Sequence, residues 1–157
     1  MSTTEHYLKM ALDLARQNAE RGGRPFASVI VKDGNVIATA VNTVAATGDP
    51  IAHAETEAIR AAAKALKSDQ LDGCILYASG HPCPMCLAAM YVSGIQQGFY
   101  AHSIEDAPDG LSRGAMMYQQ FRKPIAEQSI RLEHHPIASD GESVYAVWQR
   151  VTRGKPG

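Results

Sequence analysis

The sequence has few cysteines, few aromatic residues and no long apolar run. Its 157 residues include 3 cysteines, and 6% of the residues are aromatic. Cys83 and Cys86 lie three positions apart, which excludes a secreted disulfide framework and favours metal or redox chemistry in a reducing compartment. We therefore expect a cytoplasmic protein. The length is that of one domain with its own core, so we expect a single domain over residues 1–157.

Neither sign of charge is in excess. The formal net charge is -1 at pH 7, and the basic residues are scattered from Lys9 to Lys155. Because no basic stripe could follow a phosphate backbone, we do not expect long nucleic acid as a partner. The first residues lack a basic start followed by an apolar stretch, and no segment is long and apolar enough to cross a bilayer. We therefore expect no membrane association.

Apolar periodicity and turn residues predict alternating helices and strands. A helical face runs from Leu8 to Ala19 and ends at Gly22-Gly23, and Asp33-Gly34 indicates a hairpin. Strands are predicted over residues 27–31, 36–41, 74–78, 98–101 and 130–132, and further helices over 52–67, 84–92 and 144–148. This order predicts an α/β fold, a three-layer α/β/α sandwich with a mixed sheet.

Two short motifs lie where two of these helices begin. They are His53-Ala54-Glu55 and Pro82-Cys83-Pro84-Met85-Cys86. His-x-Glu followed by Pro-Cys-x-x-Cys is typical of zinc deaminases that act on nucleobases. Two alternatives remain open: a Cys-x-x-Cys thiol redox protein, and a structural zinc module in which Cys74 is the fourth ligand. We expect Cys74 instead to be a buried small apolar residue.

The residue types in the motifs suit one catalytic zinc ion per chain. Cys83 and Cys86 are one helical turn apart, and the start of a helix favours the thiolate form that zinc requires. With His53 they make three protein ligands, which leaves the fourth tetrahedral position for water. Glu55 follows His53 by two positions and is expected to move protons as general base and then general acid. The products are a carbonyl compound and ammonia.

At these residues the chain resembles the cytidine deaminase superfamily, and within it the bacterial guanine deaminase group. The likeness extends over about Leu8 to Tyr100 and includes residues 24–31, Asn42, Asp49-Pro50 and both motifs. The resemblance implies a five-stranded sheet between helices, a homodimer, zinc on His53, Cys83 and Cys86, and Glu55 as proton shuttle. It also implies substrate contacts from the Phe26 ring, the Asn42 side chain and the Ala54 backbone N–H.

The chain departs from that group where the substrate is selected. His81 replaces the glutamate before the Pro-Cys pair, and Arg113-Gly114 lies where the group has an acidic pair. Val92 replaces an aromatic residue, and the last five residues, 153–157, contain no tyrosine. The leading hypothesis is zinc-dependent hydrolytic deamination of a free nucleobase or related small heterocyclic amine, with guanine the first choice. The alternatives are a nucleoside, cytosine, a pterin, a triazine, or adenosine in transfer RNA.

Overall fold

The computed structural model describes residues 1–111, 113–137 and 141–153. The chain divides into two compact units, residues 1–123 and 124–157. The prediction of a single domain over residues 1–157 therefore stays a prediction.

The first unit opens with α1 (Thr3–Glu20), in which Ser2 and Glu5 form a capping box. Ser2 Oγ accepts from the Glu5 N–H at 3.2 Å, and Glu5 Oε2 accepts from the Ser2 N–H at 2.6 Å, so two backbone donors at the helix start are satisfied.

The sheet of the first unit is mixed, as predicted. Its strands are β1 (Ala27–Lys32), β2 (Asn35–Val41), β3 (Cys74–Gly80) and β4 (Gln97–His102), in the order β2-β1-β3-β4. β1 is antiparallel to both β2 and β3, and β3 is parallel to β4. Asp33 and Gly34 connect β1 to β2 with φ values of 50° and 75°, the two positive angles of a type I′ hairpin turn.

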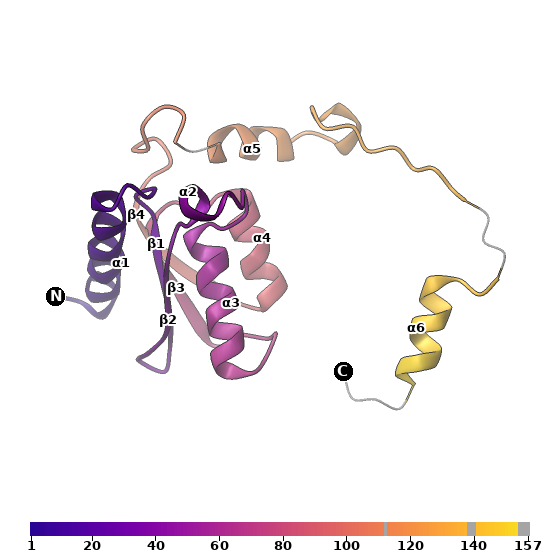
Figure 1. The fold of residues 1–157 in the computed structure, drawn as a ribbon, viewed down its shortest axis with the longest axis horizontal. Coiled ribbons are helices and arrows are strands. Elements are labelled where there is room, and N and C mark those ends of the chain that lie inside the picture. Colours follow the sequence, from indigo (N-terminus) through magenta and orange to yellow (C-terminus); the bar gives the residue numbers. More distant parts are fainter. Residues whose placement is uncertain (112, 138–140, 154–157) are drawn as a thin grey trace. The chain divides into compact units, whose positions relative to one another are not determined.

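Helices cover both faces of this sheet, which confirms the three-layer α/β/α arrangement (Figure 1). α1 packs on one face through Tyr7 and Ala11, which contact Val29, Val31 and Tyr77 of the sheet. α3 (Ala54–Leu66) and α4 (Pro84–Ser93) lie on the other face. The core there consists of Ile30, Ala38, Ala58, Ala62, Leu71, Cys74, Leu76, Ala78, Met90 and Ile95. Burial of Cys74, at 2% exposure, confirms that it is a core residue.

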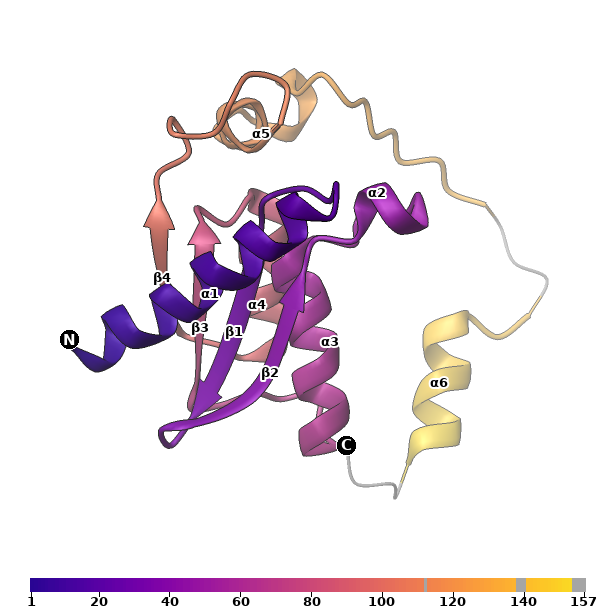
Figure 2. The same ribbon diagram turned by 60° about the vertical axis from the view of Figure 1, so that its left-hand side comes forward.

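The starts of α3 and α4 lie beyond the same edge of the sheet. β2 and β3 point the same way because each is antiparallel to β1. α3 follows the carboxyl end of β2 after the short helix α2 (Val44–Thr47), and α4 follows the carboxyl end of β3 (Figure 2). Pro84 occupies the first turn of α4, where its missing N–H costs nothing, and Gly94 ends that helix at φ 78°. The fold thus brings both motifs together.

The prediction of a fifth strand over residues 130–132 is wrong. Ile130 and Leu132 are 71% and 77% exposed in an irregular segment that pairs with none of the described strands. Three residues of alternating polarity do not make a strand without a neighbour to supply hydrogen bonds. In the first unit α5 (Gly114–Phe121) was not predicted. The second unit holds a 3-10 turn (Ile125–Glu127) and the expected closing helix α6 (Val144–Thr152).

None of the described helices has the length and apolar character needed to cross a membrane.

Candidate metal centre and substrate cavity

His53, Cys83 and Cys86 form a nearly equilateral triangle of donor atoms. His53 Nδ1 lies 3.6 Å from each sulfur, and the two sulfurs are 3.6 Å apart. His53 is the residue that caps the start of α3, and Cys83 caps the start of α4. Within the described part of the chain, these three residues are the group of metal-binding side chains that could hold an ion. Cys74 does not belong to it.

The spacing of these donors fits zinc. A tetrahedral zinc ion with Zn–S of about 2.3 Å and Zn–N of about 2.0 Å separates its ligand atoms by about 3.5 to 3.8 Å. All three donor–donor distances are 3.6 Å. Two thiolates and a neutral imidazole also balance the charge of a divalent ion. The donor set therefore matches a three-ligand zinc site in both geometry and charge.

The ionisation of the donors is coupled through their contacts. The hydrogen bond between the two sulfurs lowers the pKa of Cys83 to about 4, with a further contribution from His53. The same contact with Cys83 raises the pKa of Cys86. The hydrogen bond with Cys83 also raises the pKa of His53, while the positive charge of Arg24 acts in the opposite direction. One of the two thiols is thus stabilised as a thiolate by the other, and Arg24 lies within electrostatic reach of the centre.

Glu55 lies beside the donor triangle in the first turn of α3. Its Oε2 accepts from Cys86 Sγ at 3.3 Å, and the residue is 6% exposed. Desolvation by burial raises the pKa of this carboxyl. Although two residues apart, His53 and Glu55 approach the same point because both belong to the helix start. A buried carboxyl with a raised pKa next to a metal site is suited to proton transfer.

A cavity of about 370 Å³ opens over this centre. His53, Glu55 and Cys83 line it, and so do the sequence-predicted contacts Phe26 and Asn42. Ala54 is not on the cavity wall, but it is buried at the start of α3, and no described group accepts its N–H. The volume is appropriate for one small planar ring system. The structure therefore brings the seven predicted site residues into one region.

Asn42 presents a donor to the cavity. Its Oδ1 accepts from the Val44 N–H at 3.1 Å, which assigns the orientation of the amide and leaves Nδ2 without an acceptor among the described residues. The residue is 3% exposed. Phe26 lies against Gly80, where an added Cβ would come 3.3 Å from the ring. Glycine at position 80 therefore permits the position of the Phe26 ring.

Several residues at the site were not predicted from the sequence. Asn18 lies on the buried face of α1 and donates through Nδ2 to the carbonyls of Arg24, at 2.7 Å, and Asn42, at 2.9 Å. Arg24 itself lines the cavity. The sequence signal that could have indicated Asn18 is its position, because this polar residue lies on the same helical face as the apolar positions 11 and 15.

His81 and α5 meet at the rim of the cavity. His81 Nδ1 lies 2.8 Å from the Pro82 carbonyl and donates to it, because a carbonyl oxygen can only accept. The Tyr118 hydroxyl donates to the same oxygen at 2.8 Å, and its ring meets the His81 ring edge-on. These contacts hold α5 next to the second motif. The apolar periodicity of the sequence does not predict these contacts of His81 and Tyr118.

The departures from the guanine deaminase group fall partly on the cavity. Arg113 and Gly114 line it, whereas Val92 is 79% exposed and does not. Of the terminal residues 153–157, positions 154–157 lie outside the described residues.

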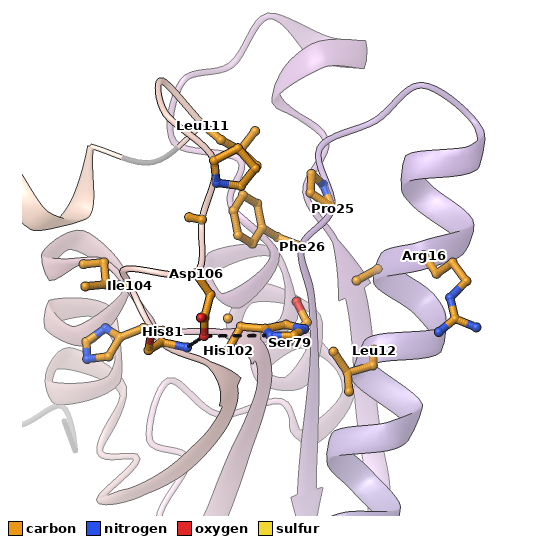
Figure 3. A pocket seen from close by; sticks show the side chains of 15 residues that line it. Leu12, Arg16, Pro25, Phe26, Ser79, His81, His102, Ile104, Asp106 and Leu111 are labelled. Carbon is orange, nitrogen blue, oxygen red and sulfur yellow. Dashed lines mark hydrogen bonds and ion pairs between the residues drawn. The ribbon is translucent and has the colours of Figure 1, made fainter.

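A second, larger cavity of about 540 Å³ lies between α1 and the loop after β4 (Figure 3). Asp106, one of its lining residues, accepts from the Ser103 N–H at 2.7 Å, so this carboxylate stabilises the loop.

A three-layer α/β protein that holds a histidine and two cysteines at two helix starts, with a buried glutamate beside them, has the architecture of a zinc hydrolase. Comparison with known families agrees. The cytidine and deoxycytidylate deaminase zinc-binding region matches residues 1–102. The chain belongs to this deaminase family, and the thiol redox and structural zinc alternatives are thereby set aside. The family and the donor set together give one zinc per chain.

The chain is similar to two kinds of deaminase over nearly its whole length. It is 46% identical over 152 residues to guanine deaminase of Bacillus subtilis, covering 96% of this chain and 97% of that protein. The X-ray structure of guanine deaminase from Bacillus subtilis superimposes with a TM-score of 0.77 at 40% identity, over 97% and 94% of the two chains. A tRNA-specific adenosine deaminase of Aquifex aeolicus is 32% identical over 94% of this chain and 95% of that protein.

Proposed function

We propose that this protein hydrolyses guanine to xanthine and ammonia. The observation that carries the proposal is the cavity itself, which is large enough for one purine and is lined by His53, Glu55 and Cys83. Similarity to guanine deaminase over 96% of the chain supports the same substrate. The reaction replaces the 2-amino group by oxygen from water, so its atoms balance as guanine plus water giving xanthine plus ammonia.

The residues of the chain divide this reaction among them. His53, Cys83 and Cys86 hold the zinc, which when bound supplies a lowered pKa, of about 7, for water. Glu55 carries one proton from water to the ring nitrogen and then the second proton of the same water to the departing amine. Phe26 stacks on the purine ring, and the Asn42 Nδ2 and Ala54 N–H groups donate to its acceptors.

A second candidate is deamination of adenosine in transfer RNA. The likeness to a tRNA-specific adenosine deaminase over 94% of the chain favours it. The net charge of -1 does not, because binding to a polynucleotide relies on clustered basic residues. Guanine therefore remains the first choice.

Ammonia release from a panel of substrates separates these candidates. The zinc-loaded protein is incubated with guanine, guanosine, adenine, cytosine, a pterin, an amino-triazine and transfer RNA. We expect guanine to give the highest kcat/KM. If transfer RNA is deaminated while free guanine is not, the guanine proposal is wrong.

We further propose that the protein is a cytoplasmic homodimer. Two thiolate ligands require a reducing compartment. α4 presents an apolar face to solvent, with Tyr91 80% and Val92 79% exposed. A second copy of the chain would bury this face, in agreement with the dimer that the family resemblance implies.

A further inference from the structure

The charges on the cavity wall are unequal. Arg24 and Arg113 both line the cavity, and Glu55 is the one carboxylate among its lining residues. No described carboxylate forms a salt bridge with either arginine. Glu55 is needed for proton transfer next to the donor triangle. Two cationic side chains are therefore left to interact with whatever enters the cavity.

Arg24 is the better fixed of the two arginines. It is half-buried, whereas Arg113 is exposed. The Arg24 carbonyl accepts from the Phe26 N–H at 2.8 Å and from Asn18 Nδ2 at 2.7 Å. Asn18 also holds the Asn42 carbonyl, so the backbones of Arg24 and Asn42 are tied to one buried side chain. Gly23 permits this arrangement, since a Cβ there would lie 2.6 Å from the Asn18 amide.

Arg24, Arg113 and Asn42 offer donors to the cavity. Asn42 Oδ1 is occupied by the Val44 N–H, so this amide contributes only Nδ2, and the two guanidinium groups accept nothing. A purine edge with two adjacent acceptors complements such a wall. Guanine has this edge at O6 and N7, away from the C2 amino group at which the reaction takes place. An arginine donates to both atoms at once, which is the commonest specific contact between proteins and guanine.

We propose that Arg24 is a specificity residue that donates two N–H groups to the O6 and N7 acceptors of a 6-oxopurine. The proposal rests on guanine deamination and adds the means by which the substrate is selected. The residue that selects the substrate is then Arg24, which precedes Pro25-Phe26 and lines the same cavity as Asn42. A 2-aminopurine without O6 loses one acceptor, and 2,6-diaminopurine presents an amino group to a donor.

The test compares Arg24→Ala with the matched control Arg113→Ala, the other cavity arginine. For zinc-loaded wild type and both variants, kcat/KM is measured for guanine and for 2-aminopurine. Arg24→Ala should lower kcat/KM for guanine by about 5- to 150-fold, the range of one good bidentate contact to a base, and lower it less for 2-aminopurine, which keeps N7 but lacks O6. Arg113→Ala should preserve the wild-type ratio. Arg24→Lys, which keeps the charge without the fork of donors, should restore only part of the loss.

Binding supplies a readout that does not depend on turnover. Hypoxanthine, a 6-oxopurine without the amino group, and unsubstituted purine are titrated calorimetrically into each protein. Arg24→Ala should weaken hypoxanthine binding by the same factor and weaken purine binding less, because purine offers only N7, with the same zinc content and thermal midpoint as wild type. An unchanged preference for hypoxanthine and guanine in Arg24→Ala, or a collapse of that preference in Arg113→Ala, overturns the assignment of Arg24. Absence of ammonia release from guanine by wild type overturns the proposed reaction instead, and the titrations still decide the role of Arg24.

Discussion

Glu55 is the residue whose chemistry is most directly testable. It is buried beside Cys86 and is the one carboxylate among the residues that line the cavity. Glu55→Gln keeps the size of the side chain and removes its ability to carry the proton. We expect one equivalent of zinc to remain bound and ammonia release to fall about 10²- to 10⁴-fold, the usual contribution of general acid–base catalysis. Metal analysis and steady-state kinetics measure the two quantities.

The control at this scale is Glu57→Gln, in the same helical turn. Glu57 pairs with Arg60 at the surface and does not line the cavity. We expect this variant to retain activity, because an exposed ion pair contributes little. Near wild-type turnover by Glu55→Gln would assign proton transfer to another group.

At the scale of elements, the metal centre connects two helices. His53 and Cys83 cap the starts of α3 and α4, and Cys86 lies in the first turn of α4. Zinc bound only by the folded protein at 1,000 times its Kd contributes about 4 kcal/mol to the free energy of unfolding. For a chain of this length that corresponds to a thermal midpoint about 8 to 16 °C lower after zinc removal. Calorimetry before and after chelation measures it.

Cys83→Ser is the matched control for the chelation experiment. It removes one donor of the triangle, so chelator should change its thermal midpoint much less than that of wild type. If the wild-type midpoint does not move when metal analysis shows that zinc has been removed, the centre does not link the two helices energetically.

At the scale of the whole molecule, the exposed apolar face of α4 predicts self-association. Leu87 and Tyr91 lie one turn apart on the helix, and Val92 adjoins them. Tyr91→Asp places a charge in a contact between two copies, so we expect wild type to be a dimer and the variant a monomer by light scattering. Val36→Asp, on the exposed part of β2, is the control and should leave the dimer intact. A monomeric wild type at micromolar concentration contradicts the prediction.

Local sequence determined the four strands and the helices α1, α3 and α4 of the first unit, together with the donor set, but not α5. Gly94 and the Asp33-Gly34 pair have backbone preferences that set where a helix ends and where a hairpin turns, whatever surrounds them. The motif residues were recognisable because metal chemistry restricts residue type and spacing. The prediction of a strand over residues 130–132 was wrong because a strand does not depend on local sequence alone. It exists only if another strand pairs with it.

The amino-acid sequence by itself determined that this chain has an α/β fold, a deaminase motif pair and a His53–Cys83–Cys86 donor set with Glu55. Only the tertiary structure decided that Asn18 joins the Arg24 and Asn42 backbones, that Tyr118 reaches Pro82, and that two arginines share a cavity with one carboxylate. The physical reason is that helix, turn and ligand preferences act between near neighbours in the chain. The contacts that select a substrate join residues that are distant in sequence and come together only on folding.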